Sequence, residues 1–252
     1  MRTVVFLAAL AAPLFCLRPV QAATLAKYYF EGNYNDSSGN GNTLTPSGPA
    51  GTISFANEDG AGVPGSQSLQ FAPTANSYPQ AVGGNYLGTN DPTLTVSFFF
   101  KATADGFFLN NFAGGVGGYP VGFGARLIYG GRFGLSTATG YGFNTIVTPA
   151  VANGGKDYRD GQWHEAIIKP FQFTFWVDNV QFSGTGGIAA GTPWLRVGAP
   201  VSSLNLGTSF TGLIDDIQVT GQGQGSISVP ESDTAWLAVT ALLLPLLRRL
   251  VS

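Results

Sequence analysis

The sequence predicts an all-β protein, and three observations carry this prediction. Glycine accounts for 36 of the 252 residues, about twice the usual share, and lies scattered between short apolar runs, as in turns between strands. Several runs alternate between apolar and polar residues, the period expected of half-buried strands. Between the two ends, no segment has the apolar spacing of an amphipathic helix. Many short strands without helices indicate a sandwich or a barrel.

The first 22 residues have the pattern of a secretory signal peptide. Arg2 supplies the positive charge, residues 4–17 form the apolar stretch, and small residues lead to expected cleavage after Ala22. The alternative is an N-terminal membrane anchor, but the apolar stretch is short and Pro13 interrupts it. We therefore expect an exported protein, with signal peptidase as a processing partner.

Cysteine and charge exclude several functions for the mature chain. Cys16 is the only cysteine and lies within the signal peptide, which leaves no disulfide, thiolate nucleophile or cysteine metal site. Residues 23–228 hold eight Lys and Arg against twelve Asp and Glu, without a basic patch. Nucleic-acid binding is therefore not expected.

Strands with period-two alternation are predicted in order along the mature chain. They are expected at 25–30, 94–100, 165–169, 173–177 and 213–219. In the second of these, the residues expected on the core face are Leu94, Val96, Phe98 and Phe100. Turn-rich clusters separate the strands at 33–42, 114–118, 153–157 and 184–187.

Two short turns help to place these strands. Asp160-Gly161 is a turn dipeptide, after which Trp163 begins a strand and is expected to close one end of the core. Asp178-Asn179 separates two apolar runs as in a tight hairpin.

Together, several of these segments resemble one known group of domains. They are YYFEGN (28–33) with NDSSGNGN (35–42), SLQF (68–71), LTVSF (94–98), DGQWHE (160–165) with FWVDN (175–179), and GLIDDIQV (212–219). In this order they resemble the LamG-like, concanavalin A-like lectin/glucanase domains, over about residues 23–221. The resemblance implies a two-sheet antiparallel jelly-roll sandwich.

The C-terminal region separates into a linker and a tail. Residues 222–229 are rich in Gly, Gln and Ser, a flexible composition. The tail, 230–252, joins a short motif to the apolar run 235–247 and two arginines. It resembles the PEP-CTERM and VPDSG-CTERM sorting tails of bacterial envelope proteins, although a serine replaces the second proline of the PEP form. The residues that carry this resemblance are Val229, Pro230, Glu231, Ser232, Arg248 and Arg249.

The resemblance of the tail implies an exosortase-like processing enzyme and delivery to the cell envelope, the cell surface or the extracellular matrix of a bacterium. As a helix, residues 235–247 would extend roughly 20 Å, which is short of the roughly 30 Å hydrocarbon core of a bilayer. We therefore expect a short C-terminal hydrophobic helix that associates with the membrane transiently. The alternative is a helix buried in the core.

No catalytic residue is predicted. His164 is the only histidine and is expected to pack or form hydrogen bonds at the start of its strand. The Glu-x-Asp-x-x-Glu pattern of catalytic members of the wider sandwich group is absent. We therefore expect a non-catalytic protein that binds glycan or matrix, or has a structural role, with extracellular polysaccharide as a partner. The alternative is a polysaccharide hydrolase or lyase on the same scaffold.

A calcium site is one interpretation of Asp215. Alternation places Asp215 on one face with three apolar residues, which are Leu213, Ile217 and Val219. If that face is the core, the carboxylate is buried and must be paired or bound to a metal. Asp36 and Asn40 of the first turn offer oxygen ligands suited to calcium. The alternative is a carboxylate that accepts backbone N–H bonds from a neighbouring loop.

A sugar-stacking platform is the expected form of a ligand site. Its candidate residues lie in or near glycine-rich loops and are Tyr119, Tyr129, Tyr141 and Phe143. Loops commonly carry the binding sites of such scaffolds.

Overall fold

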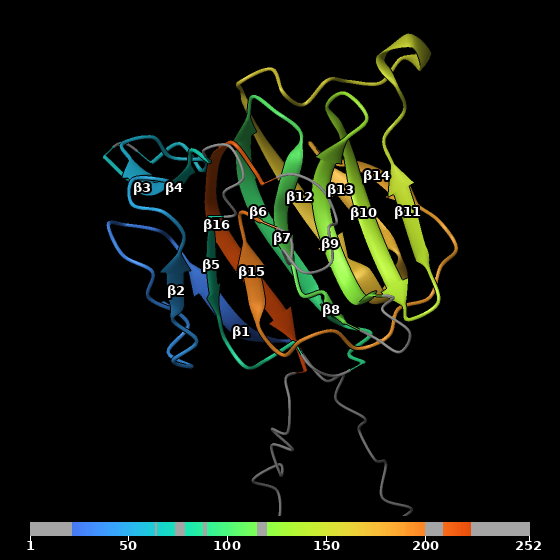
Figure 1. Cartoon of the computed structure of the whole chain (residues 1–252), viewed down its shortest axis with the longest axis horizontal. Helices are drawn as coiled ribbons and strands as arrows, with labels where there is room; N and C mark the ends of the chain where they lie inside the picture. The colour runs from blue at the N-terminus through green and yellow to red at the C-terminus, as the bar shows by residue number, and fades with distance from the viewer. Residues whose placement is uncertain are drawn as a thin grey trace, which may run out of the picture.

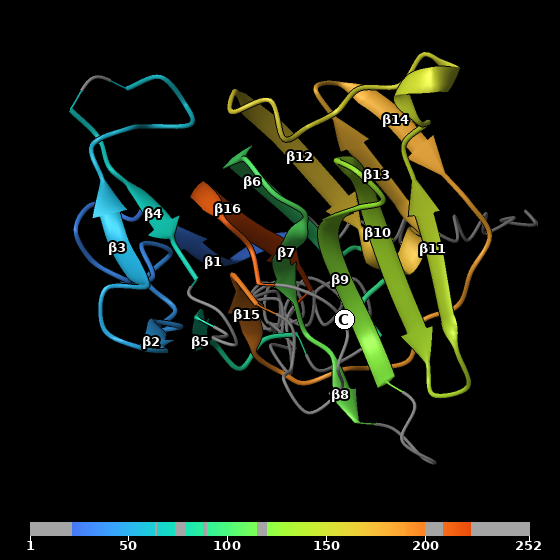
Figure 2. The same cartoon turned by 45° about the horizontal axis from the view of Figure 1, so that its top comes forward.

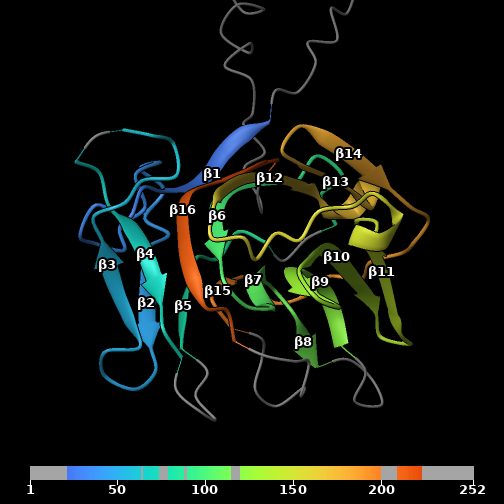
Figure 3. The ribbon, with the colours of Figure 1, turned by 90° about the horizontal axis from the view of Figure 1, so that it is seen from above.

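The computed structural model describes residues 22–63, 65–73, 79–87, 90–114, 120–199 and 209–222. In these residues two antiparallel sheets of eight strands each face one another (Figure 1). Figure 3 shows the sheets as two layers, with β1, β16, β6 and β12 in one and β5, β15, β7 and β9 in the other. The predicted all-β, two-sheet antiparallel sandwich is therefore confirmed.

The first sheet carries both ends of the described chain. Its main path runs in the order β14 (Val180–Ser183), β13 (Thr174–Val177), β12 (Trp163–Lys169), β6 (Thr95–Ala102), β16 (Gly212–Gly221), β4 (Ser68–Phe71) and β3 (Ile53–Ala56). The remaining strand, β1 (Ala23–Tyr28), pairs with β16. Ala23 lies opposite Gly221, so the two ends of the predicted 23–221 domain lie side by side.

The second sheet closes the sandwich. Its order is β11 (Phe143–Val147), β10 (Arg132–Thr139), β9 (Pro120–Ile128), β7 (Gly106–Asn110), β15 (Leu195–Val197), β5 (Gln80–Gly83) and β2 (Leu44–Ser47), and β8 (Ala113–Gly114) pairs with β9. The only described helical pieces are two 3₁₀ turns, η2 (Val151–Asn153) and η3 (Pro170–Gln172). Across the sandwich, β13 contacts β10 and β14 contacts β11 (Figure 2).

Phenylalanines fill the space between the sheets. Phe98 and Phe100 of β6 are almost fully buried, and the Phe100 ring lies 4.3 Å from the ring of Phe108 in the opposite sheet. Phe133 continues the cluster toward Phe175, with ring centroids 5.0 Å apart. Burying aromatic side chains of this size supplies most of the driving force of a core that has no disulfide.

The predicted strands match the structure closely. The predicted core face of 94–100 is buried as expected, and the segment 68–71 coincides with β4. Asp178 and Asn179 form the tight turn between β13 and β14, both with positive φ. Trp163 begins β12, but the prediction that it closes the core is wrong. Strand alternation places it opposite Lys101 on the outer face, because its neighbour His164 points inward and is buried.

The expectations for the two ends remain predictions. The signal peptide apart from Ala22, the linker beyond Gln222 and the sorting tail lie outside the described residues. Among the residues that are described, no helix is long and apolar enough to span a bilayer.

Candidate functional site: two ends of one sheet face

Asp215 lies on the outer face of β16, immediately before a bulge in that strand. Asp215 lies opposite Phe99 of β6, and Phe99 is on the outer face because the residues on either side of it belong to the core. The register then shifts between Asp215 and Gln218. Asp216 adopts a φ of 46° there, a left-handed conformation that aspartate tolerates better than most residues.

The prediction of which residues share a face with Asp215 is therefore partly wrong. Leu213 shares the outer face with Asp215, as expected. Ile217 and Val219 point into the core instead, because they lie opposite the core residues Tyr28 and Val96. A bulge adds one residue to one strand and so reverses the alternation beyond it, which simple period-two counting cannot detect.

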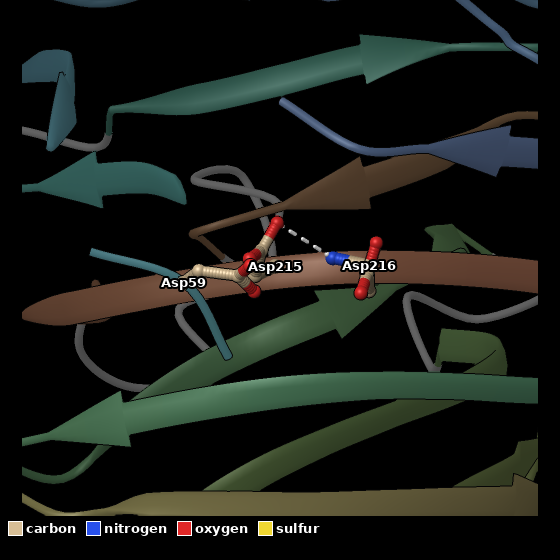
Figure 4. A group of neighbouring side chains, drawn as sticks. All are labelled: Asp59, Asp215 and Asp216. Atoms are coloured by element: carbon tan, nitrogen blue, oxygen red, sulfur yellow. Dashed lines mark hydrogen bonds between the residues drawn. The ribbon is translucent and has the colours of Figure 1, made fainter. Parts of the chain in front are cut away.

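The bulge lies where β16 changes its neighbour. Residues Gly212–Ile214 pair with β4, whereas β1 pairs only from Ile217 onward. Asp215 and Asp216 occupy the interval between the two partner strands. Three carboxylates meet there, from Asp59, Asp215 and Asp216, with one oxygen of each within 4.8 Å of the others (Figure 4). We call these three residues the acidic cluster.

A loop packs over the acidic cluster and buries Asp215, while Asp59 and Asp216 stay partly exposed. Asp215 is only 1% exposed, because Gly60 packs directly over the outer face. A Cβ on Gly60 would lie 2.4 Å from the Cβ of Phe99. The loop is held by Asp59, whose two carboxylate oxygens accept the backbone N–H groups of Ala61 and Val63, each at 2.6 Å.

Backbone groups hold the carboxylate of Asp215. Its Oδ2 accepts the N–H of Gly60 at 3.0 Å, and its Oδ1 accepts the N–H of Asp216 at 2.8 Å (Figure 4). These are the loop and backbone bonds that the sequence offered as the alternative to a metal. They do not remove the crowding of three acids in one place.

Burial and crowding both act on the protonation of these acids. Burial raises the pKa of Asp215 to about 7 despite its two backbone hydrogen bonds, and the charge of Asp216 and a side-chain hydrogen bond with Asp59 raise it further. Burial also raises the pKa of Asp216, as do the charges of Asp59 and Glu31, while Lys27 lowers it. Neutralising such a group requires a proton or a cation.

A buried hydroxyl lies beside the acidic cluster. Leu69 lies opposite Ile214, so in this register Ser68 comes beside Asp215 and on the same outer face. Ser68 is fully buried, and its Oγ has no hydrogen-bond partner. An unpartnered buried hydroxyl is costly and unusual. Extension of the register by one residue makes it a candidate fourth oxygen for the acidic cluster, and oxygen is the ligand that calcium prefers.

The predicted calcium ligands Asp36 and Asn40 are not part of this cluster. Asp36 Oδ1 accepts the N–H groups of Lys27 and Ser38, each at 2.9 Å, and its Oδ2 accepts that of Asn42 at 3.0 Å. Burial alone would raise the pKa of Asp36, but the hydrogen bonds from Ser38, Lys27 and Asn42 outweigh burial and lower it.

Asn40 belongs to the same turn as Asp36. Its Nδ2 donates to the carbonyls of Thr24 and Leu25, at 2.8 and 3.1 Å, which ties the turn to β1. The fold therefore joins Asp215 to Asp59 and Asp216 instead of Asp36. Sequence reasoning missed Asp59 and Ser68, since neither lies near Asp215 in the chain.

The opposite end of the same outer face is open. A groove of about 360 Å³ lies over β12 and β13. We call it the Trp176 groove, and its lining residues are Glu165, Ile167, Lys169, Trp176 and Asn179. Ile167 lies opposite Trp176, and the Lys169 ammonium is 5.2 Å from the centre of the indole ring. The groove thus combines an apolar floor with charged and amide groups at its border.

Sequence reasoning also missed Trp176, although a signal was present. Phe175 and Val177 on either side of it are fully buried, so alternation alone directs the indole outward. A tryptophan on the solvent side of a strand is uncommon without a binding or packing role.

The predicted aromatic platform is dispersed in the structure. Tyr129 is 73% exposed in the turn between β9 and β10, whereas Tyr141 is 88% exposed in the turn between β10 and β11. The length of β10, about 25 Å at the usual rise per residue, separates the two turns. Phe143 lies near Tyr141, and its ring packs edge-on against Phe112 at 5.6 Å. Tyr119 lies outside the described residues.

His164 is buried as predicted and has polar partners on both sides. Its Nδ1 lies 2.9 Å from Asp178 Oδ2, and its Nε2 lies 3.0 Å from Asp160 Oδ1. The ring also contacts Phe100 and Tyr158, with centroids 5.2 and 5.0 Å away. These contacts fix the start of β12. The His164 side chain is 1% exposed and therefore cannot contact a polymer in solution.

No protein-family profile and no curated protein matches the sequence. Solved structures do match the fold. It is similar to domain 4 of AbnA, a GH43 extracellular arabinanase from Geobacillus stearothermophilus in complex with arabinotriose, with 18% identity and a TM-score of 0.55 over 80% of this chain and 94% of that one.

Two further structures come from botulinum neurotoxins. One concerns type C, whose cell entry depends on interaction with two ganglioside molecules, and matches at 8% identity and a TM-score of 0.54 over 80% of this chain. The other is the binding domain of serotype D/C VPI 5993, at 9% identity and a TM-score of 0.51 over 78% of this chain. This chain spans 48% of each neurotoxin chain. At these identities the likeness shows a shared sandwich fold.

Proposed function

We propose that the protein is a non-catalytic glycan-binding module with the Trp176 groove as its binding site. The observation that carries this proposal is an outward-facing indole bordered by polar groups in a groove on the outer face. Sugars present apolar C–H faces and a rim of hydroxyls, so an aromatic floor with Glu165, Lys169 and Asn179 around it suits them. Two similar folds, an arabinanase domain with arabinotriose and a neurotoxin that depends on gangliosides, come from glycan-binding proteins.

The described residues favour binding over catalysis. Glycoside hydrolysis requires two carboxyl groups flanking the substrate, about 5–10 Å apart, and the Trp176 groove is lined by one, Glu165. The acidic cluster lies beneath a loop, with Asp215 1% exposed. A lyase could use a Tyr/His pair, but Tyr158 and His164 are 5% and 2% exposed. Release of sugar fragments from any polymer by the purified protein would contradict this proposal.

Substitution of Trp176 tests the binding site. The purified protein is applied to glycan arrays and to immobilised polysaccharides, and the affinity for each retained glycan is compared between wild type and Trp176→Ala. We expect at least about a tenfold loss, or ~1.4 kcal/mol. Tyr129→Ala is the matched control, because it removes an exposed aromatic residue from the other sheet. Equal binding by the Trp176→Ala variant would place the site elsewhere, and blank arrays would leave only a structural role.

We propose a second function for the acidic cluster, that of a structural calcium site. Asp59, Asp215 and Asp216 offer carboxylate oxygens within reach of one ion, and the unpartnered, buried Ser68 hydroxyl adds a neutral oxygen. Calcium takes six to eight oxygen ligands and tolerates irregular geometry. Bound there, it would offset the repulsion between the carboxylates and fix the 57–63 loop.

Thermal unfolding with calcium and with EDTA tests this site. Binding to the folded state alone raises the melting temperature, so we expect a lower value in EDTA for the wild type. Asp215→Asn should abolish the difference, and Ser68→Ala should reduce it. Asp36→Asn is the control, because Asp36 lies in a turn whose carboxylate already has three backbone donors. A wild-type melting curve that calcium leaves unchanged would rule the site out.

We propose that the protein is exported and then sorted to the cell envelope by its C-terminal tail. The signal-peptide pattern of 1–22 and the motif, apolar run and arginines of 230–252 support this proposal. Deletion of 230–252, or replacement of Arg248 and Arg249 by Ala, should release the protein into the medium or leave its mass unprocessed. Unchanged localisation and mass in both variants would contradict the role of the tail.

A further inference from the structure

One line of outward-facing side chains crosses five neighbouring strands of the first sheet. Trp176 lies opposite Ile167, which lies opposite Ser97. Ser97 lies opposite Gln218 of β16, and Gln218 lies opposite Lys27 of β1. Opposite residues in antiparallel strands share a face, so these side chains form a continuous line. We call these five residues the cross-strand row.

The cross-strand row is partly exposed along its whole length. Each of its residues retains partial exposure, in contrast to the buried residues on either side of them in their own strands. The bulge at Asp216 is essential to this line. Without the register shift between Asp215 and Gln218, Gln218 would point into the core.

The two ends of the row have the same chemistry. At one end the Lys169 ammonium lies 5.2 Å from the centre of the Trp176 ring. At the other, the Lys27 ammonium lies 4.4 Å from the centre of the Tyr29 ring, and Tyr29 is 40% exposed. Four strand spacings separate β13 from β1, or about 19 Å. Between the ends the row is uncharged, with an aliphatic, a hydroxyl and an amide side chain.

We propose that the cross-strand row binds one chain of a neutral polysaccharide, lying across the strands and in contact with several consecutive sugar units. Trp176 and Tyr29 are the two stacking platforms, and Ser97 and Gln218 form hydrogen bonds with hydroxyls between them. This inference rests on the proposed glycan-binding function and adds to it the class of ligand, an internal stretch of a linear polymer instead of a terminal sugar. A span of about 19 Å exceeds the size of a single sugar ring.

The length dependence of binding tests this inference. Arabino-, xylo-, cello- and chito-oligosaccharides, from the monosaccharide to the hexasaccharide, are titrated by calorimetry against the purified protein. In the series that binds, we expect affinity to rise with each unit until the row is filled. Trp176→Ala should weaken every length. Tyr29→Ala and Gln218→Ala should weaken the longest oligomers by about tenfold, or ~1.4 kcal/mol, and leave the shortest unchanged.

Two controls make the outcomes distinct. Tyr141→Ala removes an exposed aromatic residue of the other sheet and should change nothing. Acidic oligosaccharides, such as oligogalacturonates, should bind no more tightly than neutral ones. Binding that depends on Trp176 but is independent of length and of Tyr29 would overturn the extended site while leaving the proposed function intact. Tighter, salt-sensitive binding of the acidic series would overturn the neutral class. Binding of no glycan at all would overturn both proposals.

Discussion

The outer face of the first sheet has a covered end and an open end, and the two differ in whether their polar groups are buried or exposed. At the covered end, Asp215 is almost completely buried beneath Gly60. At the open end, Trp176 and its neighbours line a groove of about 360 Å³. One β-sheet surface therefore combines a covered cluster of carboxylates with an exposed aromatic groove.

The physical origin of this difference is the change of partner along β16. Where β4 gives way to β1, the strand bulges at Asp216 and a loop can pack over the interval. Where the strands β6, β12 and β13 pair in regular register, the face stays smooth and open. Irregular strand pairing thus allows polar groups to be buried on the outer face, and regular pairing leaves that face exposed. Substitutions at the two ends should accordingly affect different properties.

The largest effect is expected at the covered end, from Gly60→Ala. The added Cβ would lie 2.4 Å from the Cβ of Phe99, so the loop must move away from the sheet, at a cost of about 1–3 kcal/mol of unfolding free energy. Chemical denaturation measures this change. The stabilising effect of calcium should fall as well, while glycan affinity in the Trp176 groove should stay unchanged.

Gly142→Ala is the control for this variant, because a Cβ on Gly142 has no atom within 4 Å. Its unfolding free energy should stay within about 0.5 kcal/mol of wild type. If Gly60→Ala behaved like Gly142→Ala, the loop would not be tightly packed. If it weakened glycan binding as well, the two ends would be coupled.

An intermediate effect is expected from Asp36→Asn, which contrasts a partly exposed, hydrogen-bonded carboxylate with the buried carboxylate of Asp215. The pKa of Asp36 is lowered in the folded state by its hydrogen bonds. The folded state is therefore stabilised above the ordinary aspartate pKa of about 4, and this stabilisation is lost as the pH falls through the lower, folded value.

The measurement for this variant is the unfolding free energy from pH 7 to pH 2. The substitution should cost about 1–2 kcal/mol near pH 7, and the gap to wild type should shrink below about pH 4. The sign is opposite for Asp215, whose raised pKa makes the protonated form the favoured one. A gap for Asp36→Asn that does not depend on pH would show that the turn does not depend on the charge of Asp36.

The smallest effect is expected at the open end, from Lys169→Met. This change keeps the aliphatic stem over Trp176 and removes a partly exposed cation–π contact, worth about 0.5–1 kcal/mol. Stability should change by no more than that, and affinity for a neutral glycan should change by less than about threefold. Calorimetry with an oligosaccharide that the wild type binds measures this change in affinity. A loss as large as that of Trp176→Ala would indicate an acidic ligand.

Local pattern was sufficient for most of the fold. Alternation in 94–100 predicted both the strand and its core face, and the turn residues Asp178-Asn179 predicted the hairpin that the structure contains. These features depend on near neighbours in the chain, where side-chain direction follows directly from backbone geometry. The orientation of Trp176 was accessible to the same reasoning, because both of its neighbours are apolar and buried.

The sequence by itself determined that the chain is all-β, which faces most strands bury, and that a chain with one cysteine must fold without an internal disulfide. Only the tertiary structure decided that Asp215 points outward, that Asp59 joins it instead of Asp36, and that Trp176 and Lys27 mark the ends of one row. The reason is that these relations depend on the bulge at Asp216 and on the order of strands in the sheet. Both bring together residues more than a hundred positions apart, such as Gly60 and Asp215. No local sequence pattern encodes contacts between residues so far apart in the chain.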